Sequence, residues 1–175
     1  MQQSPIFHLK TIALAALFSS LLSLPAMAEE DVHNDADHAH AAEIELGLSL
    51  GYAYLKEEDK HGTSIHLHIN KGLADEGLMS RVSIGLGVET IITDEQHYAA
   101  MVSVNIQPWD NLILSYAPGI EWAKHHTSWA SEYANHFEAT YIIENKDFHF
   151  GPVIGYSSTR DAQHFTAGIH FAMPL

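Results

Sequence analysis

The chain has 175 residues, with 22 acidic against 8 basic side chains, a formal net charge of −14 at pH 7, and no cysteine. The acidic balance argues against a nucleic-acid partner, whose phosphates demand clustered Lys and Arg. The lack of cysteine excludes a disulfide framework and a thiolate metal site, so stability must come from packing and backbone pairing.

The first 28 residues have the pattern of a secretory signal peptide. Lys10 supplies a positive flank, residues 11–24 are an almost unbroken apolar run, and the segment ends in small residues up to Ala28. Signal peptidase reads such an ending, so we expect cleavage after Ala28. The apolar run is too short for a spanning helix. The mature chain is therefore expected to be exported and to begin at Glu29.

The character of the mature chain changes once. Residues 29–42 (EEDVHNDADHAHAA) are acidic and contain histidine but little to bury, and we expect a disordered tail. From residue 43 onward, apolar and polar residues alternate with a period of two. This pattern predicts strands that face two environments, and residues 43–175 are expected to form one domain.

The predicted strands each carry large apolar residues on one parity and small, polar or charged residues on the other. In the second strand, for example, Ile65 and Leu67 alternate with His66 and His68. The strands are predicted, in chain order, at residues 43–54, 64–70, 81–89, 97–106, 112–122, 132–144, 148–157 and 164–171. The residues that break the pattern are Ile113, Asn135, Ile142 and Val153.

The predicted connections are of two alternating kinds. Short turns are expected at 72–77, 108–111 and 145–147. Connections with histidine, charge and serine are expected at 57–62, 93–96, 123–130 and 158–162. Aromatic residues lie near the strand ends, where a membrane barrel needs interfacial girdles. The sequence therefore predicts an all-β fold, an eight-stranded antiparallel up-and-down transmembrane β-barrel with two distinct ends.

The competing fold is a soluble lipocalin-like barrel or a sandwich, in which the apolar face would point inward and the polar face outward. Two features favour the membrane barrel. The polar parity is dominated by Gly, Ser, Ala and His with almost no Lys, and the apolar parity carries large aromatics at the strand ends. Small residues are suited to a narrow lumen.

Several segments resemble known proteins. The signal peptide, the alternating strands and residues 164–171 (HFTAGIHF) resemble the small outer-membrane β-barrel superfamily. Residues 65–71 (IHLHINK), 134–141 (ANHFEATY) and 148–153 (FHFGPV) are similar to a family of short, His-bearing bacterial barrel proteins. The resemblance covers residues 43–171. It implies an outer-membrane location in a Gram-negative bacterium, with membrane lipid and the barrel-insertion machinery as partners, but no activity.

The predicted lumen is rich in imidazole and carboxylate. Its histidines are His66, His68, His97, His136, His149, His164 and His170, and its acidic residues are Glu43, Glu45, Glu89, Glu121, Glu132, Glu138 and Glu144. Arg81 is the one basic residue assigned to this face. Buried carboxylates need counter-charge, which protonated histidines, protonated carboxylates or a bound cation could provide. Neutral imidazole with carboxylate is a ligand set for divalent transition metals, zinc above all.

A metal site is predicted where these residues converge near one rim. His66 and His68 are two apart on one strand, as are His136 and Glu138, so each pair shares a face. The candidate metal ligands are His66, His68, Glu89, His97, Glu121, His136, Glu138 and His164. His149 and His170 are placed toward the other rim. The predicted function is a barrel that binds or senses a divalent metal ion.

The sequence is also compatible with two other functions. A structural or adhesion-type barrel would use the same lumen as a metal-free polar network, because any polar residue is excluded from the lipid face. A lipid-modifying enzyme could use Ser103 with His136 and Glu138, or Ser157 with His164. No nucleophile motif marks either serine, which disfavours an enzyme.

Overall fold

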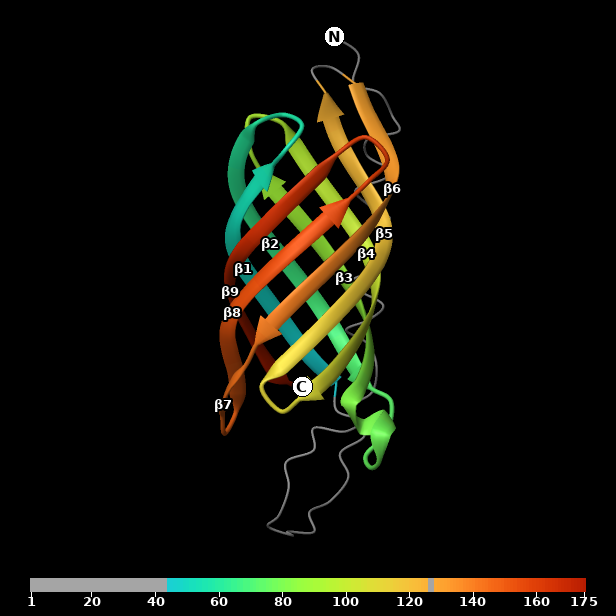
Figure 1. Ribbon diagram of the computed structural model, residues 1–175, viewed down its shortest axis with the longest axis vertical. Coiled ribbons are helices and arrows are strands. Elements are labelled where there is room, and N and C mark those ends of the chain that lie inside the picture. Colours follow the sequence, from blue (N-terminus) through green and yellow to red (C-terminus); the bar gives the residue numbers. More distant parts are fainter. Residues whose placement is uncertain (1–43, 126–127) are drawn as a thin grey trace. The chain divides into compact units, whose positions relative to one another are not determined.

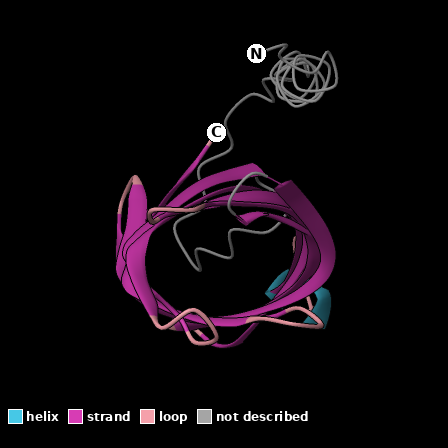
Figure 2. Cartoon of the chain, turned by 90° about the horizontal axis from the view of Figure 1, so that it is seen from above, coloured by secondary structure: helices cyan, strands magenta, loops and turns pink. Residues whose placement is uncertain are grey.

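The computed structural model describes residues 44–125 and 128–175, which form a closed antiparallel β-barrel (Figures 1 and 2). The strands are β1 (Ile44–Leu55), β2 (Lys60–Gly72), β3 (Val82–Ile92), β4 (Gln96–Trp109), β5 (Leu112–His125), β6 (Ser128–Tyr141), β7 (Ile143–Asn145), β8 (Phe148–Ser158) and β9 (Gln163–Pro174). A 3-10 turn, η1 (Leu78–Arg81), precedes β3. The predicted signal peptide and tail lie outside the described residues. Within those residues, no helix is long and apolar enough to cross a membrane.

From β1 to β6 and from β7 to β9 each strand pairs with the next along the chain, and β1 pairs with β9. The ring closes through β6 and β8. The short β7 continues β6, because both pair with β8: Thr140 of β6 lies opposite Val153, and Ile143 of β7 lies opposite Phe150. At the break, the Ile142 N–H donates to the Asn111 carbonyl at 2.8 Å instead. Because β6 and β7 together act as one strand, the predicted eight-stranded up-and-down barrel is confirmed.

An even number of strands brings both ends of the barrel's chain to one rim. Glu45 near the start of β1 lies opposite Pro174 at the end of β9. We call this rim the terminal end and the opposite rim the distal end. The described connections at the distal end, residues 56–59, 93–95 and 159–162, are short.

The outer face of the barrel is apolar. Val102 and Ile154 expose 55% and 63% of their surface, and the outward Ile84 and Val104 lie opposite each other on β3 and β4. The inward parity carries the buried polar residues instead, including Ser49, Asn105 and Ser157. This distribution inverts that of a soluble barrel and matches a barrel whose outer surface contacts lipid. The predicted assignment of the two faces is confirmed.

Aromatic side chains contact one another on the outer face near both ends. Tyr98 stacks on Trp129, with ring centroids 5.8 Å apart, toward the distal end. Phe150 stacks on Phe171 at 6.0 Å toward the terminal end. Such pairs are placed as interfacial girdles require.

The predicted limits of two distal connections are wrong. The connection placed at 57–62 is shorter because β2 begins at Lys60, where pairing with Leu55 extends the ladder. His61 is therefore a strand residue that faces outward and stacks on Tyr54. The connection placed at 123–130 is also shorter, because β5 continues to His125 and β6 begins at Ser128. Backbone pairing extends these strands beyond the last apolar residue of the pattern.

Arg81 does not face the lumen as predicted. It lies in η1 at the terminal end, where its guanidinium donates to Asp110 Oδ1 at 3.0 Å and to the Gln107 carbonyl at 3.2 Å. The 3-10 turn takes Arg81 out of the strand alternation. Glu144, also predicted to face the lumen, lies opposite the inward His149 and so on the lumen side of β7, but it is exposed at the terminal end.

Candidate functional site

Histidine and glutamate fill much of the lumen. Every histidine predicted to face inward is buried or half-buried there. A cavity of about 50 Å³ lies among them, and none of the described residues that line it is Lys or Arg. A site of about 10–15 Å³ holds one water molecule, so this cavity has room for a few waters or for an ion with a water ligand. The ionisable residues form three groups along the barrel.

The distal group contains its own cation. His97 is buried, with its Nε2 atom 3.7 Å from Glu58 Oε1 and its Nδ1 atom 3.7 Å from Glu121 Oε1. The Lys60 ammonium lies 3.1 Å from Glu58 Oε2 and 3.4 Å from Glu95 Oε1. Lys60 therefore supplies one positive charge to Glu58 and Glu95, so a protein cation already compensates part of the charge of the distal group.

The middle group is built around Glu89. The Glu89 Oε2 atom lies 3.5 Å from His136 Nδ1 and 3.7 Å from His164 Nε2. These residues come from β3, β6 and β9, so the group bridges the narrow lumen between distant strands. The Ser64 hydroxyl donates to Glu89 Oε1 at 2.7 Å, and Ser157 Oγ lies 3.5 Å from His136 Nε2. One ligand atom from each of the three residues fits within 4.8 Å of the others.

Two histidines of β2 connect the middle and terminal groups. His66 Nδ1 lies 3.4 Å from Glu138 Oε2, and the His66 ring lies 5.0 Å from the His68 ring. His68 stacks parallel on His170, with centroids 5.2 Å apart and an interplanar angle of 0°. His68 thus packs between imidazoles rather than beside a carboxylate.

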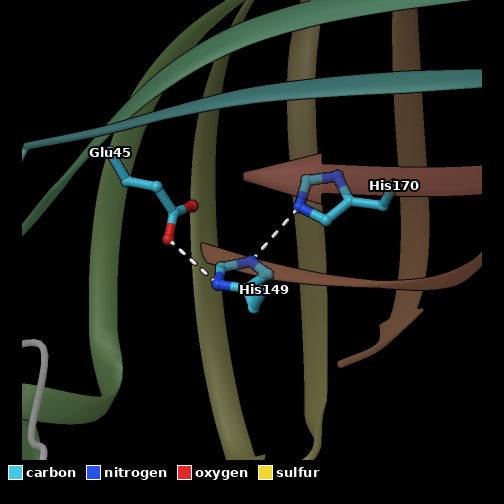
Figure 3. A group of neighbouring side chains, drawn as sticks. All are labelled: Glu45, His149 and His170. Carbon is cyan, nitrogen blue, oxygen red and sulfur yellow. Dashed lines mark hydrogen bonds and ion pairs between the residues drawn. The ribbon is translucent and has the colours of Figure 1, made fainter. Parts of the chain in front are cut away.

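The terminal group consists of Glu45, His149 and His170, on β1, β8 and β9 (Figure 3). His149 lies between the other two side chains. Its Nδ1 atom is 3.5 Å from Glu45 Oε2, and its Nε2 atom is 3.3 Å from His170 Nε2. Ligand atoms of this group also lie within 4.8 Å of one another.

The structure divides the predicted ligands among several groups rather than one. Glu89, His136 and His164 meet in the middle group, whereas His97 and Glu121 lie in the distal group. His66 pairs with Glu138, and His68 stacks on other imidazoles. Sequence reasoning missed Glu58 and Glu95 because both lie in connections, where strand alternation assigns no direction. It also missed Lys60. This residue lies on β2 an even number of positions from the inward His66, so the two side chains share the lumen face.

The enzyme alternatives gain little from this geometry. Ser157, His136 and Glu89 follow the order of a hydrolytic triad, but Ser157 is only 1% exposed and the adjoining cavity is too small for an acyl chain. Ser103 contacts Asn70 and Asn105, each at 3.4 Å, in an amide and hydroxyl network. Neither serine presents its oxygen to a lipid substrate.

Comparison with known proteins shows the fold. The structure is similar to that of Ail, the attachment invasion locus protein of Yersinia pestis, with a TM-score of 0.56, 9% identity, and coverage of 77% of this chain and 99% of that one. The N-terminal β-barrel domain of Pseudomonas aeruginosa OprF is similar with a TM-score of 0.56 and 10% identity, over 77% of this chain and 98% of that one. Neisserial surface protein A is similar with a TM-score of 0.53 and 6% identity, over 75% of this chain and 96% of that one.

The chain has the fold of small outer-membrane β-barrels. No family model and no curated protein matches the sequence. At identities of this size the shared feature is the barrel itself, and the residues of the lumen must carry any argument about function.

Proposed function

We propose that this protein is an outer-membrane β-barrel that binds a divalent transition metal ion, zinc in the first instance, between Glu89, His136 and His164. One observation carries the proposal: a buried carboxylate oxygen lies within 3.5 and 3.7 Å of two imidazole nitrogens from opposite parts of the ring of strands. Three protein ligands with an open fourth position are typical of zinc sites that keep a water ligand.

The spacing of these atoms suits a zinc ion. Zinc–ligand distances of about 2.0–2.1 Å in a tetrahedron place neighbouring ligand atoms about 3.3 Å apart. The two contacts of Glu89 exceed this spacing by only a few tenths of an ångström, which side-chain rotation can supply. The neighbouring cavity has room for a water molecule as the fourth ligand.

Neighbouring hydroxyls support the ligands. Ser64 holds one oxygen of Glu89 and leaves Oε2 toward the imidazoles. Ser157 faces His136 Nε2, and a proton on that nitrogen leaves Nδ1 unprotonated toward Glu89. Such outer contacts orient ligands in metal sites. A divalent cation here would also compensate the buried Glu89 charge, which no Lys or Arg among the described cavity residues does.

We place the protein in the outer membrane of a Gram-negative bacterium. The apolar outer face supports contact with lipid, and the N-terminal pattern supports export with cleavage after Ala28. Insertion would then use the barrel-insertion machinery. The His-bearing segments 65–71, 134–141 and 148–153 favour grouping this chain with short, His-bearing barrels.

Metal analysis of the refolded protein tests the proposed site. Protein freed of metal and refolded in lipid vesicles is titrated with zinc, and bound zinc is counted per chain. The His136→Ala, His164→Ala double variant should lose one equivalent. The matched control is His66→Ala, which removes a lumen imidazole that contacts Glu138 instead. Equal zinc uptake by the parent and the double variant would leave Glu89 and its neighbours as a metal-free polar network in a structural barrel.

A further inference from the structure

A second group of metal-ligating side chains lies at the terminal end, outside the site proposed above. Glu45, His149 and His170 come from three neighbouring elements, β1, β8 and β9, and converge inside the lumen (Figure 3). Gly151 lies opposite His170 on β8, and Ser49 lies opposite it on β1, so small residues flank the imidazole on both sides.

We propose that Glu45, His149 and His170 form a second binding site for a divalent transition metal ion, at the terminal mouth of the barrel. The central observation is that the Nε2 atoms of His149 and His170 lie 3.3 Å apart. Neighbouring ligands in a tetrahedral zinc site are separated by about the same distance. The two Nε2 atoms are thus already spaced as adjacent ligands, closer to that ideal than the two contacts of Glu89. Glu45 contacts the other ring nitrogen of His149, Nδ1, so its carboxylate must rotate to join the same ion.

The contact between these nitrogens restricts their protonation. Two Nε2–H groups would point their hydrogens at each other, so at least one nitrogen must present its lone pair. Ser49 Oγ lies 3.1 Å from His170 Nδ1 and can accept a hydrogen bond from an N–H at that nitrogen. That tautomer leaves Nε2 of His170 unprotonated and directed toward His149, as a metal ligand requires.

The surroundings fix His170 and leave access from the terminal mouth. His68 stacks parallel on one face of His170, and His170 is only 3% exposed. The Glu45 side chain is 25% exposed, and that of His149 is 11% exposed. An ion entering from this end would meet the Glu45 carboxylate first and then the two imidazoles. The exposed carboxylate thus supplies charge at the entrance, and the buried imidazole supplies a rigid ligand.

The terminal group differs from the distal group in its source of charge. At the distal end Lys60 already lies against Glu58 and Glu95. The cavity that reaches both Glu45 and His170 has no Lys or Arg among its described lining residues. An ion at the distal end would therefore compete with an ammonium group, whereas no Lys or Arg is among the described residues that line the cavity toward the terminal end.

Counting zinc in matched variants tests this site independently of the middle one. We expect two equivalents in the refolded parent, one in the His149→Ala, His170→Ala variant, one in the His136→Ala, His164→Ala variant, and none in the quadruple variant. Parental zinc content in the first variant would overturn the terminal site. Parental content in the second variant alone would overturn the middle site and leave the terminal site standing.

A spectroscopic variant avoids dependence on the buried His170. The chain has no cysteine, so His149→Cys introduces a single thiol at the terminal group. Because thiolate is a strong ligand for transition metals, cobalt added to this variant should produce a thiolate-to-cobalt charge-transfer band. The control is Ser103→Cys, a buried lumen position in the asparagine and serine network. Absence of the band in folded His149→Cys, or an equal band in the control, would overturn the proposed ligand set.

Discussion

Gly47 and His68 lie opposite each other on β1 and β2, and the missing side chain of Gly47 makes the space that the His68 imidazole occupies. A Cβ atom at Gly47 would overlap the His68 ring. The same ring stacks on His170 of the terminal group. Gly47 on β1 therefore acts through His68 of β2 on a histidine of β9, the strand on its other side. The small residues of the lumen leave the space that its imidazoles fill.

Replacing Gly47 with alanine should destabilise the barrel. The added methyl group must displace His68 from its stack, and overpacking of this kind costs about 1–3 kcal/mol. The free energy of unfolding in lipid vesicles, measured with urea, checks this. In the Gly47→Ala, His68→Ala double variant the clash is removed, so the two losses should not add. Strict additivity would show that Gly47 is required for its backbone rather than for the space it leaves.

The strands and their faces were predictable because the side chains of a strand alternate with a period of two. That rule correctly directed His66 and Glu89 inward, and their pairing across β2 and β3 is seen. It could not show that Glu89 contacts His136 and His164 while His66 contacts Glu138. Those contacts cross the lumen between strands that are not neighbours, so they depend on barrel closure, strand tilt and side-chain rotamers.

The charge balance of the lumen was less predictable for a related reason. The strand alternation of β3 predicts that Arg81 faces inward, but η1 takes this residue out of the alternation. The apolar pattern of β2 begins only at Ile65, so the sequence predicts Lys60 in a connection. Backbone pairing with β1 extends the strand to Lys60 and turns its ammonium toward Glu58. Strand ends are decided by backbone partners that side-chain patterns do not report.

Lys60 should control whether the distal group binds metal. Removing the ammonium in Lys60→Ala leaves Glu58 and Glu95 without their shared cation beside His97. We expect this variant to bind one zinc ion more than the parent. Lys56→Ala is the matched control. It removes the same charge from the distal end, but the Lys56 ammonium donates to Gln163 and not to the carboxylates of the distal group. An unchanged zinc count in Lys60→Ala would show that these carboxylates do not gather around an ion.

The orientation in the membrane can be tested by single cysteines, since the natural chain has none. Export with an even strand number predicts that the terminal end faces the periplasm and the distal end faces outward. Arg160→Cys, in the exposed β8–β9 connection, should react with an impermeant thiol reagent on intact cells. Asp147→Cys, in the exposed turn at the terminal end, should react only after the outer membrane is disrupted. The reverse labelling pattern would invert the topology.

A charge placed on the outer face should cost more at mid-strand than at the rim. Val102 is an outward residue in the middle of β4 and is 55% exposed, whereas Ile92 is outward at the distal end of β3 and is 57% exposed. In lipid, Val102→Arg should lose about 2–4 kcal/mol of unfolding free energy and Ile92→Arg about 0–1 kcal/mol. Because the two residues are almost equally exposed, a difference between the two losses reflects their different depths in the membrane. Similar losses at both positions would argue against a membrane around this belt.

Zinc binding at the middle and terminal sites should weaken as the pH falls. Each site uses two imidazoles, which bind metal only when a ring nitrogen is unprotonated, and an unperturbed imidazole has a pKa of about 6.5. Protons therefore compete with zinc below this pH, and the affinity should approach a loss of about 100-fold per pH unit when both imidazoles of a site are protonated in the free protein. The affinity is measured by zinc titration in lipid vesicles between pH 5 and pH 8, on the two double-histidine variants that isolate each site. A carboxylate-only site would lose affinity near pH 4 instead, so a flat profile over this interval would remove the histidines from the ligand set.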